Sequence, residues 1–152
     1  MKSGDRFILR GKLDSLNAQI VFLQTLSENS EYIYDLEEIR QIVRELQACE
    51  AGGKIFDGEF SLWGMSADEL HSLSHNPDGG HILPHVDMKR EAAGLNLLRT
   101  SVREAELASC RAFTEDSLRI SHTLNRLSSA VYVLTFKYLP ENYLHRLKFG
   151  KA

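Results

Sequence analysis

The chain has 152 residues, of which 43% are hydrophobic and 26% are charged, and its formal net charge is −3 at pH 7. This length fits one domain with its own core, so we expect residues 1–152 to form a single domain. The composition excludes a disordered chain, the nearly balanced charge gives no indication of nucleic-acid binding, and no apolar run approaches the roughly 20 residues that span a membrane.

Four long segments place apolar residues at the spacing of an amphipathic helix. We expect helices over about 9–26, 31–51, 87–113 and 115–138. Gly52 and Gly53 follow the second segment and Pro140 follows the fourth, and these residue types end helices. The two cysteines, Cys49 and Cys110, lie far apart in sequence in these helices, and we expect reduced, buried thiols in a cytoplasmic protein.

The region between the second and third helices is irregular. Residues 52–65 are rich in glycine and aromatic residues and predict a loop with a short strand or turn. A capping box at 66–69 opens a short helix to about Leu73, and a second loop follows at 76–85. A short C-terminal helix is expected at about 141–147. The sequence therefore predicts an all-α five-helix bundle, four long helices plus the short C-terminal one, with an irregular crossover.

Three charged residues of the third long helix, Arg99, Arg103 and Glu106, fall at i, i+4 and i+7. At roughly 100° per residue they share one stripe about 60° wide, directly beside the apolar arc of that helix. A similar polar stripe on the fourth long helix begins with Asn125, and Asp14 interrupts the apolar pattern of the first. Three helices therefore offer polar groups at the edge of the core.

The charged stripe allows two interpretations. Surface ion pairs, such as Arg103 with Glu106, contribute only tenths of a kcal/mol and need no ligand. Leucines on both flanks of the stripe, however, place the charges in partly dry surroundings, where a charge is paired or meets a ligand. Two arginines one turn apart can grip a polyphosphate with paired N–H donors, and Glu106 can orient one of them or help to hold a metal ion.

Histidines are concentrated in and after the short helix of the crossover. His71 and His75 have i, i+4 spacing and are candidates for binding a divalent metal. No nearby cysteine or HExxH motif completes a zinc signature, so histidines that line a loop or pocket are the alternative. The sequence contains no GxxxxGK[ST] or GxGxxG motif, so phosphate binding cannot depend on a P-loop or a Rossmann turn.

Three stretches resemble, in the same order, three signatures of the ATP:cob(I)alamin adenosyltransferases with the PduO-type bundle fold. They are GKLDSLNAQI (11–20), LLRTSVREAE (97–106) and LNRLSSAVYV (124–133). The segment ADELHSLSH, followed by a loop that ends in LP, is most similar to the ethanolamine-utilization branch of this family. That branch carries a longer N-terminal region with a Cys/His metal cluster, and we expect this chain to be a shorter homologue or a fragment.

The resemblance implies a homotrimer that binds ATP, Mg²⁺ and cob(I)alamin between neighbouring subunits. Such enzymes transfer the 5′-deoxyadenosyl group of ATP to the reduced cobalt and release triphosphate. Arg103 would contact the triphosphate, and Arg99 would form an intersubunit salt bridge with Asp14 of the next chain. Glu106 would complete the catalytic group by supporting the ATP or metal site, and Asn125 would touch the nucleotide. The branch implies a role in ethanolamine utilization, with microcompartment association as an open question.

The resemblance also implies a corrinoid pocket, which we expect in the crossover. The expected lining residues are Phe56, Phe60, Trp63, His81 and Ile82. Family members wrap ATP with an N-terminal TGDxGxT loop, of which only Ser-Gly-Asp at 3–5 is present here. Two alternatives to the enzyme remain, a non-catalytic carrier of corrinoid or nucleotide and a structural helical oligomer.

Overall fold

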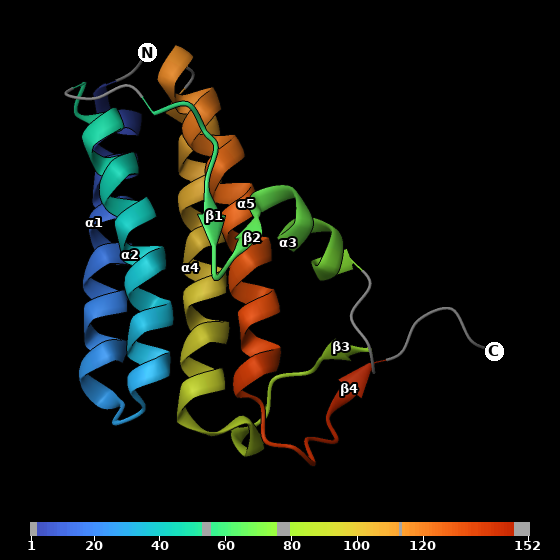
Figure 1. The fold of residues 1–152 in the computed structure, drawn as a ribbon. Coiled ribbons are helices and arrows are strands. Elements are labelled where there is room, and N and C mark those ends of the chain that lie inside the picture. Colours follow the sequence, from blue (N-terminus) through green and yellow to red (C-terminus); the bar gives the residue numbers. More distant parts are fainter. Residues whose placement is uncertain (1–2, 53–55, 76–79, 113, 148–152) are drawn as a thin grey trace.

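A computed structural model describes residues 3–52, 56–75, 80–112 and 114–147 (Figure 1). The helices are α1 (Ser3–Leu26), α2 (Ser30–Glu50), α3 (Ala67–His75), α4 (Lys89–Ala112) and α5 (Glu115–Tyr138). Two small antiparallel pairs accompany them, β1 (Ser61–Leu62) with β2 (Met65–Ser66) and β3 (His81–Ile82) with β4 (Arg146–Leu147). A 3₁₀ turn, η1 (Val86–Met88), leads into α4. The predicted all-α class and its four long helices are confirmed.

The long helices form two antiparallel pairs, α1 with α2 and α4 with α5 (Figure 1). The contact between α4 and α5 is the most extensive in the fold, and α1 packs against both α2 and α4. The crossover from α2 to α4 passes the α4–α5 pair as the β1–β2 hairpin and then forms α3, which packs on the outside of α5. This path places α3 and β3 beside the α4–α5 pair, away from α1 and α2.

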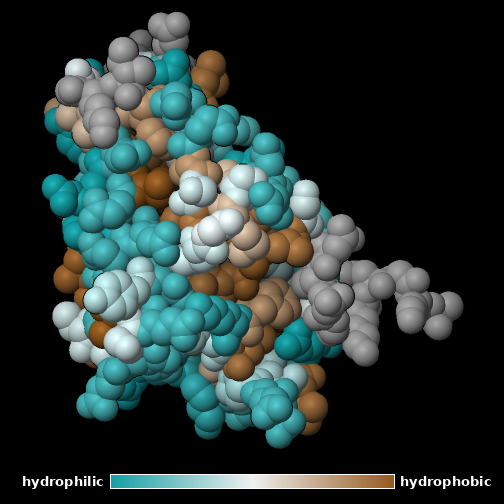
Figure 2. All heavy atoms as spheres, in the orientation of Figure 1, coloured by the Kyte–Doolittle hydropathy of each residue, from teal (hydrophilic) through white to brown (hydrophobic). Residues whose placement is uncertain are grey.

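The buried face of each long helix consists of the residues at helical spacing. Leu16, Leu46, Leu98 and Leu127, one from each long helix, are almost completely buried in a single core. Each such side chain stabilises the fold by about 1.5–3 kcal/mol relative to exposure. Figure 2 shows hydrophobic side chains in the middle of one face, around the β1–β2 hairpin, and hydrophilic side chains on the side formed by α2.

Polar side chains determine where two of the helices begin. The Ser66 hydroxyl accepts a hydrogen bond from the Glu69 backbone N–H at 3.1 Å, which confirms the predicted start of α3. The Thr114 hydroxyl accepts from the Ser117 N–H at 3.0 Å, and the Ser117 hydroxyl accepts from the Thr114 N–H at 2.7 Å. This reciprocal capping box lets α5 begin with only two residues between it and the end of α4.

The predicted C-terminal helix at 141–147 is wrong. The chain forms a turn there, in which the Tyr143 N–H donates to the Pro140 carbonyl at 3.1 Å, and continues into β4. Tyr143 is buried with its hydroxyl bonded to the Leu83 carbonyl, whereas Leu144 is 85% exposed. A two-turn helix with so little buried surface is not stable in water, so pairing with β3 satisfies the backbone instead.

The helices also test the expectations for the N-terminal loop, the two cysteines and a membrane-spanning segment. Residues 3–5, which match the start of an ATP-binding loop, form the first turn of α1 and not a loop. Both cysteines are free, as expected, but only Cys49 is buried, because Cys110 lies on an exposed position of α4. Across the described ranges, no helix combines the length and the apolar character that crossing a membrane requires.

Gly94 of α4 permits a close approach between helices, and this can be tested. A Cβ atom at position 94 would lie 2.7 Å from Leu23 Cδ2 and 3.1 Å from the Tyr32 hydroxyl, whereas Gly11 of α1 has open space around it. Gly11→Ala should raise the free energy of unfolding by about 0.5–1 kcal/mol because alanine favours the helix. Gly94→Ala should lower it by about 1–2 kcal/mol, since overpacking outweighs that gain. Urea unfolding measures both, and equal stabilisation by the two variants would contradict the close approach.

Candidate functional site: a cavity between α3, β3, α4 and α5

The polar stripes of α4 and α5 meet along one side of a cavity of about 480 Å³. From α4 come Arg99, Arg103 and Glu106, and from α5 come Asn125 and Tyr132, together with two serines. Residues of α3 and β3 form the remaining walls. Because α4 and α5 pack against each other along most of their length, residues at matching heights on the two helices share this cavity.

The two arginines give the cavity an excess of positive charge. Arg99 is half-buried and donates one N–H to Asn96 Oδ1 at 3.1 Å, while its buried Nε has no hydrogen-bond partner among the described residues. Burial lowers the pKa of Arg99 below its usual value, and the neighbouring charge of Arg103 lowers it further. Arg103 itself is exposed at the cavity. An incompletely bonded guanidinium beside a second one is a favourable position for a multiply charged anion.

A hydrogen bond joins the two helices at the cavity wall. Asn125 Nδ2 donates to Glu106 Oε2 at 3.2 Å. This bond orients both side chains, and the carboxylate keeps further acceptor positions that a cation or a hydroxyl group can use. Among the described residues that line the cavity, Glu106 is the one acidic residue, against the two arginines.

The α3 wall contains a pair of histidines in direct contact. His71 Nδ1 lies 2.9 Å from Ser129 Oγ, and His71 Nε2 lies 3.1 Å from His75 Nε2. Burial lowers the pKa of His71, and the positive charge of Arg126 and then of His75 adds to this effect. In this contact one ring donates an N–H to the other, and the facing Nε2 atoms are the groups that a divalent metal would use.

The β3 wall is held in place by one tyrosine hydroxyl. Tyr132 Oη accepts a hydrogen bond from the Ile82 N–H at 3.2 Å and lies 3.0 Å from His81 Nδ1. The hydroxyl thus joins the backbone and the imidazole of β3 to α5 through two hydrogen bonds. His81 and Ile82 thus lie at the cavity by way of a bond to α5.

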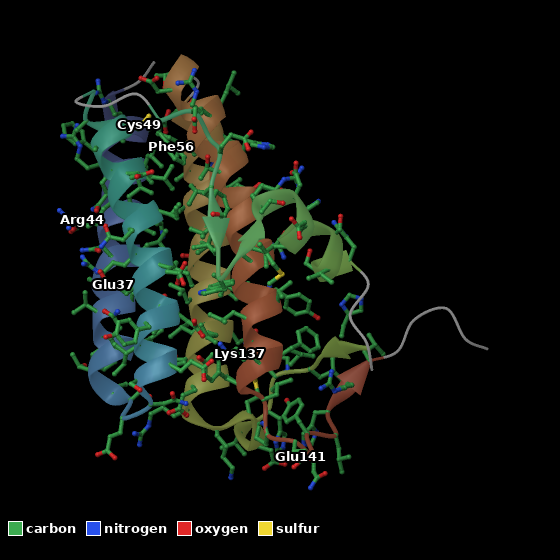
Figure 3. The ribbon with its side chains drawn as sticks, viewed as in Figure 1. Glu37, Arg44, Cys49, Phe56, Lys137 and Glu141 are labelled. Atoms are coloured by element: carbon green, nitrogen blue, oxygen red, sulfur yellow. The ribbon has the colours of Figure 1, made fainter. Side chains whose placement is uncertain are left out.

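The aromatic residues expected in the corrinoid pocket lie elsewhere. Phe56 is buried near the end of α2, beside Cys49 in Figure 3, at the opposite end of the bundle from β3. Phe60 and Trp63 pack against the main core. The indole N–H of Trp63 donates to the backbone carbonyl of Asp35 at 3.2 Å, which docks the hairpin on α2. Of the five expected residues, the structure therefore brings only His81 and Ile82 to the cavity.

Asp14 also lies apart from the other site residues. It is exposed on α1 and lines a second cavity of about 490 Å³, together with Arg10, Gln47 and Glu50. Arg99 faces the first cavity, from which Asp14 is absent. Within one chain these two residues therefore do not form the pair that the resemblance implies.

Comparison with known proteins gives this arrangement a family. A family model described as Cobalamin adenosyltransferase matches residues 1–138. The chain belongs to the cobalamin adenosyltransferase family. The relative named Corrinoid adenosyltransferase EutT from Salmonella typhimurium is 38% identical over 144 residues, which cover 88% of this chain and 52% of that protein. The protein of the same name from Escherichia coli K12 is 37% identical over 142 residues, with the same coverage. The chain spans about half the length of these curated relatives.

The resemblance to the cobalamin adenosyltransferases is thereby confirmed, while the structure adds cavity residues that the sequence did not single out. Ser74 of α3 and Ser128 of α5 line the cavity. No sequence pattern indicates Ser74, since its contribution depends on how α3 docks on α5. Tyr132, by contrast, belongs to the predicted stripe of Asn125, Ser129 and Tyr132 at i, i+4 and i+7, and it positions β3.

The lowered pKa of His71 predicts a pH effect on the stability of the chain. The unfolded chain binds more protons at this site as the pH falls below the ordinary histidine pKa of about 6.5, so stability decreases from there down to the folded pKa. Above that range His71 contributes no pH dependence. His71→Asn should therefore reduce the fall in the urea midpoint between pH ~7.5 and ~5.5. If the urea midpoint of the variant falls as much as that of the wild type, protonation of His71 does not destabilise the folded chain.

Proposed function

We propose that this chain transfers the 5′-deoxyadenosyl group of ATP to cob(I)alamin, yielding adenosylcobalamin and triphosphate, and that it serves ethanolamine utilization. One observation carries the proposal. In a chain of the cobalamin adenosyltransferase family, Arg99 and Arg103 face one cavity together with Glu106 and Asn125. The two relatives bear the name corrinoid adenosyltransferase, which agrees with this activity.

Arg103 would bind the triphosphate of ATP. Its exposed guanidinium presents several N–H donors at the cavity, and the charge of Arg99 one helical turn away adds to the attraction for the anion. Glu106 offers a carboxylate oxygen for Mg²⁺, which proteins hold with one or two carboxylates and the substrate phosphates. The ion would neutralise charge on the departing triphosphate, and Asn125 would orient Glu106 and touch the nucleotide.

The reaction needs no nucleophile from the protein. The electron pair of cobalt in cob(I)alamin attacks C5′ of ATP, and the new Co–C bond forms as the C5′–O bond breaks. Triphosphate leaves with the electron pair of that bond. The chain's residues hold C5′ in line with cobalt and stabilise the leaving group, which are the effects of positioning and of fixed charge. His81 and Ile82 of β3 and the His71–His75 pair would form the corrinoid side of the cavity, and the pair is also the proposed position for a divalent metal.

We propose a homotrimer in which Asp14 of one chain pairs with Arg99 of the next. Arg99 has an unbonded buried Nε, and Asp14 is exposed on a different face, so an intersubunit pair would satisfy both. Large apolar side chains near Asp14 on α1 are exposed in the single chain, among them Phe7 at 65% and Phe22 at 61%. Burial of such residues between subunits would stabilise an oligomer. The enzyme would work in the cytoplasm, with or without a microcompartment.

Charge exchange tests the intersubunit pair. Arg99→Asp or Asp14→Arg alone would place like charges together and should shift the protein from trimer to monomer in sedimentation velocity. The double variant restores opposite charges and should recover the trimer. Failure of the double variant to recover it, with both single variants monomeric, would contradict direct pairing.

Replacement of Arg103 tests the catalytic proposal. Arg103→Ala should leave the fold intact, because the side chain is exposed at the cavity, but should lower adenosyl transfer by about 100-fold or more. The assay follows the spectral change from cob(I)alamin to adenosylcobalamin under anaerobic conditions with Mg-ATP. Arg44→Ala, at an exposed position on the outer side of α2 in Figure 3, is the matched control and should retain full activity.

The same assay separates the enzyme from its two alternatives. Full turnover by Arg103→Ala would refute the role of the arginine. A wild-type chain that binds ligand without turnover would be a carrier, and Mg-ATP at 100 times its Kd stabilises a nucleotide binder by about 2.7 kcal/mol. A chain that binds neither ATP nor corrinoid would be a structural oligomer.

A further inference from the structure

The C-terminal segment returns to the loop in front of α4 and is fixed there by backbone bonds. In the β3–β4 pair, His81 lies opposite Leu147 and Ile82 opposite Arg146. Just beyond the ladder, the Leu83 N–H donates to the His145 carbonyl at 2.9 Å. Residue 145 is therefore held beside the chain at positions 83–87, although the two segments are 58 residues apart in sequence.

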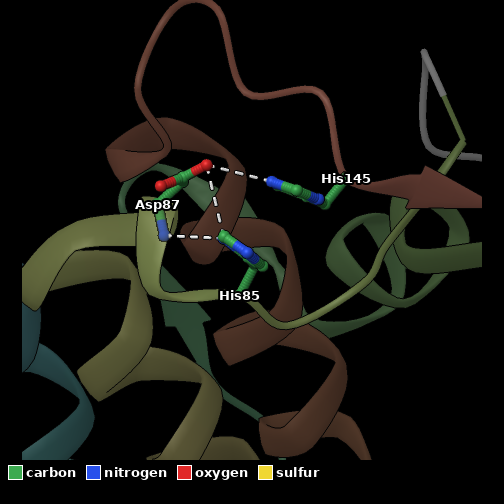
Figure 4. Close-up of side chains that lie close together, drawn as sticks. All are labelled: His85, Asp87 and His145. Atoms are coloured by element: carbon green, nitrogen blue, oxygen red, sulfur yellow. Dashed lines mark hydrogen bonds and ion pairs between the residues drawn. The ribbon is translucent and has the colours of Figure 1, made fainter.

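Three polar side chains converge at this junction, as Figure 4 shows. Asp87 Oδ2 lies 3.0 Å from His145 Nε2 and 3.3 Å from His85 Nδ1. The two imidazole rings are nearly parallel, with centroids 3.8 Å apart. One ligand atom from each residue lies within 4.8 Å of the other two. Among the described residues, these three form the group of histidine, cysteine or acidic side chains whose ligand atoms lie this close together.

The spacing and the chemical types of these atoms suit a transition-metal ion. Two ligand atoms about 2.0–2.1 Å from a tetrahedral zinc ion are about 3.3–3.4 Å apart, close to both distances from Asp87 Oδ2. Two imidazole nitrogens and one carboxylate oxygen favour zinc, cobalt, nickel or iron over calcium or magnesium. His85 Nδ1 accepts a hydrogen bond from the Asp87 N–H at 3.0 Å, and a metal ion would take the place of that bond at the Nδ1 lone pair.

The backbone positions of the site are fixed, but its side chains are accessible to solvent. Its ligands come from the N-cap of η1 (His85), from η1 itself (Asp87) and from the residue before β4 (His145). Backbone hydrogen bonds fix the positions of His85 and His145. The side chains of His85, Asp87 and His145 are 42%, 60% and 37% exposed, so water can occupy the remaining coordination positions. This accessibility distinguishes the cluster from the His71–His75 pair at the cavity, which offers two nitrogens.

We propose that His85, Asp87 and His145 bind one divalent transition-metal ion, which clips the C-terminal segment to the loop before α4. The ion would close a long loop of the chain across its two ends and stabilise the β3–β4 pair. Because β3 supplies His81 and Ile82 to the cavity, the clip fixes one wall of the site described above. The proposal does not depend on the activity of the chain.

Calorimetric titration of the metal-free, full 152-residue chain with zinc chloride tests the clip. The wild type should bind one zinc ion per chain at this cluster and unfold at a higher temperature when zinc is present. His145→Gln and Asp87→Asn should each weaken this binding by about tenfold or more and abolish the zinc-dependent rise in Tm. Two different ligands are tested because either variant alone could disturb the junction, and circular dichroism without zinc verifies the fold.

Two controls identify which histidines are responsible. His122→Asn removes an exposed histidine of α5 outside the cluster and should leave zinc binding unchanged. The double variant His71→Gln/His75→Gln should retain the zinc ion that raises Tm. Loss of zinc binding in this double variant but not in His145→Gln, or absence of zinc binding by the folded wild type, would overturn the proposal.

Discussion

The packing of α4 against α5 is the contact on which the candidate site depends. Each helix buries one apolar face and keeps a polar stripe at the border of that face, so the same contact that forms the core aligns the two stripes. The bond between Glu106 and Asn125 lies at this border. A helix pair that slipped by one turn would still bury leucines, but it would separate these polar groups. The site is therefore sensitive to the register of the helices as well as to its own residues.

The charge balance of the cavity explains why the fold tolerates a partly unsatisfied arginine. Removing a guanidinium from water is costly, and the single chain recovers only part of that cost through Asn96. The remaining cost is a source of binding free energy, because an anion or a neighbouring subunit that supplies the missing acceptor is bound more tightly. At Arg99, the missing hydrogen bond lowers the stability of the chain without ligand and raises its affinity for a partner that supplies the acceptor.

Local patterns allowed the long helices to be predicted, and distant contacts account for the failures. Periodicity predicts α5 at its observed position, and helical spacing alone places the three charges of α4 on one face. The expected C-terminal helix failed because Tyr143 is buried by the loop at Leu83, a contact between residues far apart in sequence. The resemblance implies a corrinoid pocket in the crossover and so suggests Trp63 as a lining residue, whereas the docking of Trp63 on α2 depends on the path of the crossover.

The His85–Asp87–His145 cluster also depends on contacts between distant segments, and the sequence alone does not predict it. Neither His-x-Asp nor a lone histidine near the end of the chain predicts a ligand set, and only the pairing of β3 with β4 brings them together. The predicted His71–His75 contact needed no such information, since i, i+4 spacing on one helix is sufficient.

Trp63 also has a consequence for how the crossover can be observed. It is the single tryptophan of the chain, and its backbone φ of 52° lies in the left-handed region, which is strained for a residue with a side chain. Together with Gly64 at φ 79°, it forms the two-residue turn between β1 and β2, which requires a positive φ at both positions. The bonds from its indole and from its backbone N–H dock this turn on α2, and both are lost if the hairpin leaves α2. The intrinsic fluorescence of the chain therefore reports this one event, in a part of the molecule that neither arginine touches.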